Sequence, residues 1–424
     1  MLRLAYNLAA WLAQPLLRRK LARRALAEPG YGKLVEERFG HYKVARPDGP
    51  GPLIWIHAVS LGETRAAAIL LAALREQEPQ MRLLLTHGTA TGRAEGQKLL
   101  QAGDVQVWQP WDTRGAVRRF LHCFRPDLGI LMETEVWPNL LLESAARGLP
   151  LALANARLSE KSLRAAERGA WLMRPAYDAL AVAWAQTEDD AERLRAIGVR
   201  QVRVLGNLKF DVQPDAAQLE RGRAWGEAST RPVVMFASSR EGEEAEFLRC
   251  LKDGSTPLES AGVQWLIVPR HPQRFDEVAE LIARHGLSVS RRSTWGETPP
   301  APADVWLGDS LGEMAAYYAA SDAALLGGSF APLGGQNLIE AAACGCPVLM
   351  GPHTFNFAEA ARLAESAGAA RRVECLADAI VDSCKLVHDR DAQVAMRESA
   401  LRFASAHRGA AKRTADAALS LIQG

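Results

Sequence analysis

Short apolar runs alternate along this chain with longer segments in which apolar residues recur at helical spacing. The runs are five to eight residues long and rich in Val, Leu, Ile and Ala, as expected of strands buried on both faces. In the first half of the chain they occupy residues 53–59, 82–87, 105–110, 128–132, 151–156, 182–187 and 202–207. Strands that alternate with helices predict a mostly parallel sheet with helices on both faces.

The alternation pauses at residues 210–232, where the pattern is polar and irregular, and then resumes. Further strands are predicted at residues 233–238, 263–270, 305–309, 323–328 and 347–351. We therefore expect two tandem, doubly wound Rossmann-like α/β domains, at residues 53–207 and 232–390, facing a cleft at the carboxyl ends of their strands. A final helical segment, residues 391–424, is a candidate for crossing back to the first domain.

The segment from residue 325 to 357 combines a strand, a glycine-rich turn, a helix and a second strand. Gly334 and Gly335 let backbone amides approach a ligand closely, and a helix starting directly after them would direct its unpaired N–H groups to the same place. Asn337 and Glu340 are three residues apart, so both side chains can face one ligand. This segment predicts a nucleotide pocket, with a phosphate at the turn and a carboxylate near ribose hydroxyls.

Several ionisable residues follow predicted strands of the first domain. Glu63 lies in the first turn of a helix, where it either does chemistry or complements the helix dipole. Glu133 and Glu135 follow a buried strand and could orient a base, contact sugar hydroxyls, stabilise positive charge on a sugar ring, or cap the chain. Lys209, near the domain boundary, could approach a phosphate leaving group or be a surface lysine. His57 is more typical of a buried histidine than of a catalyst.

Two loops of the second domain have similar positions. Arg270 stands in a loop stiffened by Pro269 and Pro272, and its guanidinium can meet a phosphate with two donors. Residues 308–313 form another strand-to-helix turn, whose amides could hold a base or a phosphate. Because both loops follow strands of one sheet, they are expected at the same edge as the glycine-rich turn.

Composition and charge narrow the possible partners. The 424 residues suffice for about two to three domains, and the net charge of +2 is too small to suggest a nucleic-acid partner. Residues 1–46, however, hold ten Lys and Arg against three Glu, a net charge of +7 that leaves −5 for the rest of the chain. The basic surface is therefore local to the N-terminal segment.

Residues 4–17 of that segment carry no charge, but the run is shorter than the ~20 residues of a spanning helix. Four apolar residues would share one helical face: Leu4, Leu8, Trp11 and Leu12. Pro15 should end or kink this helix. An apolar face beside dense basic charge predicts contact with an anionic membrane surface; the alternative is a helix packed on the protein's own core.

Sequence motifs for disulfide, metal or dinucleotide sites are absent from the chain. The six cysteines form no C-x-x-C pair, which is typical of buried, reduced thiols in a cytosolic protein. No D-x-D sequence follows a strand, no Walker A pattern occurs, and the glycine spacing does not match a dinucleotide fingerprint. Neither a metal nor a nicotinamide cofactor is expected.

Taken in order, these motifs resemble the 3-deoxy-D-manno-octulosonate (Kdo) transferases of lipopolysaccharide synthesis. The matching segments span about residues 1–360 and read HAVSLGE, THGTATG, METEVWPNLL, NARLS, GNLKFD, ASSREGEE, VPRHPQRF, GDSLGE and GGSFAPLGGQNLIEAAACGCPVLMGPHTFNF. Each motif alone is a weak signal, whereas the ordered set is highly specific. Gln336, Leu338 and the pair Ser239-Arg240 depart from the family's pattern, which puts fine donor contacts in doubt rather than the reaction.

The resemblance implies a GT-B fold and transfer of Kdo from CMP-Kdo to a lipid A precursor, lipid IVA, with inversion at the anomeric centre. It implies no metal and no cofactor, and a place at the cytoplasmic face of the inner membrane. Glu63 would be the general base, and Glu133 and Lys209 would stabilise the transition state. The implied CMP contacts are Pro269, Arg270, Leu311, Gly312, Glu313, Asn337, Leu338, Ile339 and Glu340. The alternatives are a GT-B sugar-nucleotide epimerase and a non-catalytic nucleotide-sugar binder at the membrane.

Overall fold

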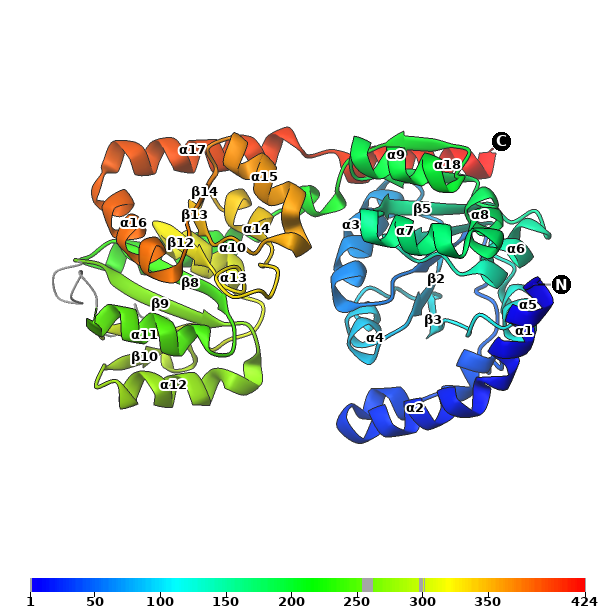
Figure 1. Cartoon of the computed structure of the whole chain (residues 1–424), viewed down its shortest axis with the longest axis horizontal. Helices are drawn as coiled ribbons and strands as arrows, with labels where there is room; N and C mark the ends of the chain where they lie inside the picture. The colour runs from blue at the N-terminus through cyan, green and yellow to red at the C-terminus, as the bar shows by residue number, and fades with distance from the viewer. Residues whose placement is uncertain (1, 254–261, 297–299, 301, 424) are drawn as a thin grey trace. The chain divides into compact units, whose positions relative to one another are not determined.

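The computed structural model describes residues 2–253, 262–296, 300 and 302–423. Within these ranges, the side chains of Leu2, Arg3, Leu4, Asp253 and Gln423 are not described. The chain folds as two compact units (Figure 1). Unit 1 comprises residues 1–211 together with 408–424, and unit 2 comprises residues 212–407. Each unit is built around one parallel sheet.

Unit 1 contains a seven-stranded parallel sheet in the order β3-β2-β1-β4-β5-β6-β7. Its strands are β1 (Leu53–His57), β2 (Arg82–His87), β3 (Val105–Trp108), β4 (Leu128–Met132), β5 (Leu151–Ala156), β6 (Val182–Ala185) and β7 (Val202–Val204). All seven predicted strands are confirmed, although several end two or three residues earlier than the apolar pattern predicts. Every residue of β1 and β4 is buried, because helices cover both faces of the sheet.

The two faces of this sheet carry separate cores. On one face, Ile54 and Ile56 of β1 pack with α3 (Leu61–Gln77) and α18 (Ala410–Gln423). On the other, Leu53 and Trp55 pack with further helices. The remaining helices of the unit after β1 are α4 (Ala90–Gln97), α5 (Arg114–Phe124), α6 (Pro138–Ala145), α7 (Glu160–Arg168), α8 (Ala170–Asp178) and α9 (Glu188–Ile197), with the 3₁₀ turn η3 (Leu208–Asp211).

Unit 2 contains a second seven-stranded parallel sheet, in the order β10-β11-β9-β8-β12-β13-β14. Its strands are β8 (Val233–Ser239), β9 (Gln264–Pro269), β10 (Val289–Arg291), β11 (Val305–Leu307), β12 (Ala323–Leu326), β13 (Val348–Met350) and β14 (Ala370–Arg372). Its helices are α10 (Ala216–Ala228), α11 (Glu243–Asp253), α12 (Phe275–Arg284), α13 (Met314–Ala320), α14 (Leu338–Ala343), α15 (Ala358–Ser366), α16 (Leu376–His388) and α17 (Arg390–Ala406), with the 3₁₀ turns η4 (Pro272–Arg274), η5 (Arg292–Thr294) and η6 (Phe355–Phe357).

Two predictions for unit 2 need correction. The strands β10 and β14 were not expected, because each is only three residues long and contains Arg in place of an apolar run. The stretch expected to be irregular instead contains helix α10, which packs closely on α13. A Cβ at Gly222 of α10 would lie only 2.1 Å from the carbonyl oxygen of Ala316. Close helix packing therefore stabilises α10 where the apolar pattern gives no signal.

The C-terminal stretch forms two helices, α17 and α18, separated at Gly409, whose φ of +93° suits glycine. Helix α18 belongs to unit 1, where it packs against α3. The carboxylate of Asp211 accepts hydrogen bonds from the backbone N–H groups of Gly409 and Ala411. These bonds fix the start of α18 beside Asp211, the last residue of the first of the two chain segments that form unit 1.

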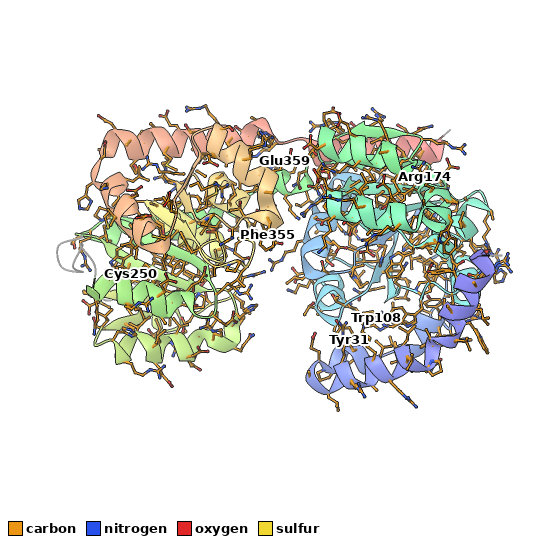
Figure 2. The ribbon with its side chains drawn as sticks, in the orientation of Figure 1. Tyr31, Trp108, Arg174, Cys250, Phe355 and Glu359 are labelled. Carbon is orange, nitrogen blue, oxygen red and sulfur yellow. The ribbon has the colours of Figure 1, made fainter. Side chains whose placement is uncertain are left out.

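The N-terminal segment forms α1 (Leu2–Leu12) and α2 (Gln14–Ala27), followed by the 3₁₀ turns η1 (Pro29–Gly32) and η2 (Val35–Phe39). Pro15 lies in the first turn of α2, so it separates two helices as predicted. Tyr31 of η1 stacks on Trp108 of β3 with ring centroids 6.4 Å apart (Figure 2). Of the helices within the described ranges, none is long and apolar enough to cross a membrane.

Candidate active site

The carboxylate of Glu63 is held at the start of α3, directly beyond the end of β1. Ser60 caps this helix, and its side chain accepts from the backbone N–H of Glu63. The Glu63 carboxylate in turn accepts from the backbone N–H of Val59 at 2.8 Å and from the Ser60 hydroxyl at 3.0 Å. Burial raises the pKa of Glu63 to about 7, and the nearby charges of Glu135 and Glu133 add to the effect.

The carboxylate of Glu133 pairs with Lys209. Glu133 follows β4 with a φ of +54°, an uncommon value for a residue other than glycine. Its backbone is fixed to the neighbouring strand, since its N–H donates to the carbonyl of Ala154 at 2.9 Å. The Lys209 Nζ donates to Glu133 Oε1 at 2.9 Å, and so the start of η3 is brought to the carboxyl end of β4.

Asn155 supports this pair, and it was not singled out from the sequence. Its side-chain amide approaches Glu133 Oε1 at 3.5 Å, and its Oδ1 accepts from the backbone N–H of Leu208 at 3.0 Å. Asn155 also has a positive φ, of +51°, which Asn tolerates better than most residues. A polar residue in the apolar run of β5 is the signal that could have identified it.

A third carboxylate, that of Glu135, lies in the same loop. It accepts from the indole N–H of Trp137 at 2.8 Å, and its Oε2 is 3.8 Å from Nε2 of the fully buried His57. Burial raises the pKa of Glu135, and the charge of Glu133 adds to this. Burial lowers the pKa of His57 to about 3, so the imidazole is neutral near pH 7. His57 is thus a buried histidine, as expected.

In unit 2, the glycine-rich turn is built on a buried carboxylate. The backbone N–H of Gly328 donates to both oxygens of Glu243, at 2.9 and 2.8 Å, and the N–H of Arg240 donates to one of them at 2.9 Å. Gly335 then donates its N–H to the carbonyl of Gly328 at 2.7 Å. Glu243 was not predicted as a site residue, although it belongs to the ASSREGEE motif. It fixes the turn between β12 and α14.

The predicted pair Asn337 and Glu340 is in contact at the start of α14. Asn337 caps the helix by accepting from the N–H of Ile339 at 3.2 Å, and its amide donates to Glu340 Oε1 at 3.2 Å. Helix α14 begins at Leu338 and has only six residues, so it starts later and is shorter than expected. One of the N–H groups at the start of α14 is therefore already paired within the protein.

The other predicted nucleotide contacts are distributed over two loops of unit 2. Pro269 ends β9 and is buried, whereas the side chain of Arg270 is exposed. Leu311 is 74% exposed. Both oxygens of Glu313 accept from Arg292 at 3.0 Å. These contacts and one from Ser310 outweigh the effect of burial and lower the pKa of Glu313.

The position of Arg292 could not be predicted, because it lies in η5, outside every motif. Since its guanidinium engages both oxygens of Glu313, the loop that contains Gly312 is better suited to meet a ligand with its backbone than with that carboxylate. Gly312 has a φ of +81°, a conformation that glycine adopts without strain.

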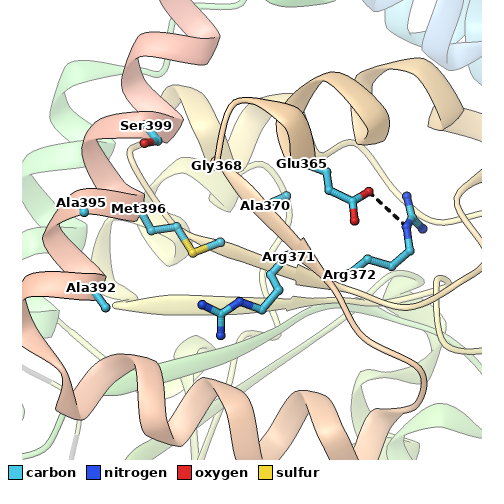
Figure 3. Close-up of a pocket in the computed structure, with 9 residues that line it drawn as sticks. All are labelled: Glu365, Gly368, Ala370, Arg371, Arg372, Ala392, Ala395, Met396 and Ser399. Carbon is cyan, nitrogen blue, oxygen red and sulfur yellow. Dashed lines mark hydrogen bonds and ion pairs between the residues drawn. The ribbon is translucent and has the colours of Figure 1, made fainter.

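A cavity of about 450 Å³ lies elsewhere in unit 2, between β14, α15 and α17 (Figure 3). Its lining includes Arg371, Arg372 and Met396. Arg372 pairs with Glu365 at 3.3 Å. None of the predicted site residues lines this cavity, so it is separate from the predicted nucleotide site.

Two further expectations can be compared with the described residues. Within them, no three His, Cys, Asp or Glu side chains form a group that could hold a metal ion; metal independence stays a prediction. Three cysteines are buried, but Cys123 and Cys250 are partly exposed and Cys375 is exposed. The expectation of buried thiols is therefore wrong for Cys375, which precedes α16 at the surface.

The three predicted catalytic residues all belong to unit 1, and the nine predicted CMP contacts all belong to unit 2. Within unit 1, the structure brings Glu63, Glu133 and Lys209 to the carboxyl ends of the adjacent strands β1 and β4. Within unit 2, the predicted contacts follow β9, β11 and β12.

Comparison with known proteins identifies the family to which the whole chain is similar. Residues 33–212 match the family model described as 3-deoxy-D-manno-octulosonic-acid transferase (kdotransferase). The 3-deoxy-D-manno-octulosonic acid transferase of Bordetella pertussis is 47% identical over 421 residues, covering 97% of each chain. That of Haemophilus influenzae is 30% identical over 423 residues, covering 98% of each chain.

Solved structures show the fold. A UDP-GlcNAc 2-epimerase from Neisseria meningitidis has a TM-score of 0.56 at 15% identity and covers 88% of this chain and 99% of its own. A glycosyltransferase from Rickettsia africae has a TM-score of 0.58 at 14% identity, with the same coverage. Together with the two parallel sheets, these neighbours show a two-domain GT-B fold. The chain belongs to the 3-deoxy-D-manno-octulosonic acid (Kdo) transferases and is a glycosyltransferase.

Proposed function

We propose that this Kdo transferase moves Kdo from CMP-Kdo to lipid IVA, a lipid A precursor, with inversion and without a metal, and that Glu63 is the general base. The observation that carries the proposal is the state of the Glu63 carboxyl. It is fixed by two hydrogen bonds, and burial raises its pKa to about 7. A base is most effective when its pKa lies near the working pH, whereas an ordinary glutamate would be a weaker base.

In this proposal, the carboxylate of Glu133 and the ammonium group of Lys209 stabilise the transition state. As the bond to the CMP phosphate breaks, positive charge develops on the sugar ring and negative charge on the leaving phosphate. A carboxylate stabilises the first and an ammonium stabilises the second. The 2.9 Å contact between Glu133 and Lys209 holds two opposite charges side by side, so both can be supplied by one fixed pair.

The donor would bind in unit 2. In this proposal Arg270 meets the single phosphate of CMP-Kdo, and Asn337 with Glu340 meets the ribose. The mutual hydrogen bond of Asn337 and Glu340 keeps both side chains on one side of α14. A guanidinium and backbone amides can neutralise one phosphate, which is why the proposal includes no metal.

The acceptor is a membrane lipid, and we place the protein at the cytoplasmic face of the inner membrane. Three apolar side chains of α1 are between 57 and 63% exposed: Leu8, Trp11 and Leu12. Trp171 of α8, a helix in contact with α1, is 47% exposed. The neighbouring basic residues of α2 suit an anionic lipid surface.

Incubation with CMP-Kdo and lipid IVA tests the reaction, with product detected by mass spectrometry and the anomeric configuration read by NMR. Glu63→Gln should abolish turnover while CMP binding is kept; Glu160→Gln, an exposed glutamate at the start of α7, is the matched control. Product retention of the donor's configuration, or full loss of activity on treatment with a chelator, would contradict the proposal. A converted nucleotide sugar without lipid product would instead identify the epimerase alternative.

Membrane contact is tested by flotation with vesicles of neutral or anionic phospholipid. Trp11→Ser should weaken binding to anionic vesicles severalfold, because a large apolar side chain no longer enters the interface. The control is Leu401→Ser in α17, which replaces another exposed apolar side chain (47% exposed). Equal binding of both variants and the wild type would argue for packing on another protein surface instead.

A further inference from the structure

His57 and Glu135 face each other in unit 1, and the reaction proposed above uses neither. Their closest atoms, His57 Nε2 and Glu135 Oε2, are 3.8 Å apart. The His57 side chain is fully buried, and its Nε2 has no hydrogen-bond partner among the described residues. A buried polar atom without a partner is costly, so this nitrogen requires an explanation.

The hydrogen bonds of the other ring nitrogen determine the tautomer of His57. Nδ1 lies 3.1 Å from the carbonyl oxygen of Thr86 and 2.9 Å from its hydroxyl. The Thr86 carbonyl can only accept, and the Thr86 hydroxyl donates its own hydrogen to Gln109 Oε1 at 3.3 Å, so Nδ1 carries the hydrogen. Burial lowers the pKa of His57 to about 3, so the ring is neutral. Its Nε2 therefore presents a lone pair towards Glu135 and needs a donor.

The surroundings of Glu135 favour its neutral form. Its side chain is 14% exposed and receives one hydrogen bond, from the Trp137 indole. No Lys or Arg in the described part of the chain lies within ion-pair distance of it. The titratable groups that act on Glu135 or on its neighbours come from several elements. They are His57 from β1, His87 from β2, Glu63 from α3, Glu133 from its own loop, Lys209 from η3 and Arg38 from η2. Lys209 pairs with Glu133, and His87 and Arg38 act on His57. If Glu135 were ionised, its carboxylate would be the third in this group, after those of Glu63 and Glu133. It would also face the lone pair of His57 Nε2, which would be unfavourable.

We propose that Glu135 is a protonated positioning residue, whose O–H donates to His57 Nε2. Its neutrality removes the repulsion that an ionised Glu135 would exert on Glu63, and burial then remains the main cause of the raised pKa of Glu63. The 3.8 Å separation between His57 Nε2 and Glu135 Oε2 must shorten by about 1 Å to form this hydrogen bond. The part about Glu63 rests on its proposed role as the base, whereas the part about Glu135 does not.

Infrared spectroscopy of the whole protein tests the protonation directly. Above pH 8, where Glu63 is ionised, the wild type should show the carbonyl stretch of a buried carboxylic acid. The band should be absent from Glu135→Gln and present in Glu63→Gln. If the wild type shows no such band, or if Glu135→Gln keeps it, the proposal is overturned. This result does not depend on whether Glu63 is the base.

The pH profile of kcat/KM tests the effect on Glu63. His57→Phe removes the acceptor, so Glu135 should ionise and move the acid limb up by about one pH unit through charge repulsion. Glu135→Gln in the His57→Phe background should return the limb to the wild-type position, which a merely structural role would not do. An unmoved limb in folded His57→Phe, judged by near-UV circular dichroism, would overturn the coupling. If Glu63→Gln is fully active, the proposed base fails, and the infrared result stands alone.

Discussion

Replacing Glu63 by Gln should make unit 1 more stable at alkaline pH. Burial raises the pKa of Glu63 from an ordinary 4.5 to about 7 in the folded protein. Below pH 4.5 the carboxyl is protonated in both the folded and the unfolded chain, so it contributes no difference. As the pH rises to 7 the unfolded chain loses this proton first, and the folded protein becomes progressively less stable.

The magnitude follows from the same shift. A difference of about 2.5 pKa units corresponds to about 3 kcal/mol of unfolding free energy, fully present above pH 7. Gln carries no charge and can still accept from Val59 with its carbonyl and donate to Ser60 with its amide, so little else is lost. For a domain of about 200 residues, ~3 kcal/mol corresponds to a rise in Tm of several degrees.

The assay is thermal and urea unfolding of wild type and Glu63→Gln at pH 5, 6, 7 and 8, followed by tryptophan fluorescence, with Glu160→Gln as the control. The stability difference should be small at pH 5 and greatest at pH 8, and confined to the transition of unit 1. A variant that is less stable than the wild type at pH 8, or a difference independent of pH, would refute the reasoning.

Three other predictions concern the reaction and unit 2. The acid limb of kcat/KM should fall about tenfold per pH unit below pH 7, because the base must be deprotonated; a limb near pH 4.5 would argue against Glu63. Lys209→Met leaves the Glu133 carboxylate without its ammonium partner and should lower kcat on the order of 10²-fold or more, measured under donor saturation, whereas Lys209→Arg should keep more activity. Gly222→Ala forces a Cβ to 2.1 Å from a carbonyl oxygen of α13 and should destabilise unit 2 by about 1–3 kcal/mol in urea unfolding; Gly296→Ala, which meets nothing within 4 Å, should not.

The sheets could be predicted from the sequence because long apolar runs identify central strands. The edge strands β10 and β14 could not, since three residues with one or two Arg carry no periodicity. The catalytic candidates Glu63 and Glu133 were predictable because both follow buried strands that turn out to be neighbours. The order of the strands in the sheet, by contrast, was not predictable from their spacing along the chain.

The supporting residues were harder to predict than the candidates themselves. Asn155, Glu243 and Arg292 act through backbone groups or through other side chains, and such contacts depend on backbone conformation. Both Glu133 and Asn155 adopt a positive φ, for which the sequence offers only the weak preference of Asn. The shift of two residues in the start of α14 has a similar origin, because the capping contact of Asn337 determines it.

The return of α18 to unit 1 has a consequence for biosynthesis. Unit 2 is a continuous stretch, residues 212–407, placed within the sequence of unit 1. During translation, the whole of unit 2 therefore leaves the ribosome before the alanines within residues 410–418 can pack into the core next to α3. Unit 2 can complete its fold first, while unit 1 keeps one apolar face of its sheet incompletely covered. Chains that end at residue 407 and are released from the ribosome should accordingly be protease-resistant in unit 2 and sensitive in unit 1.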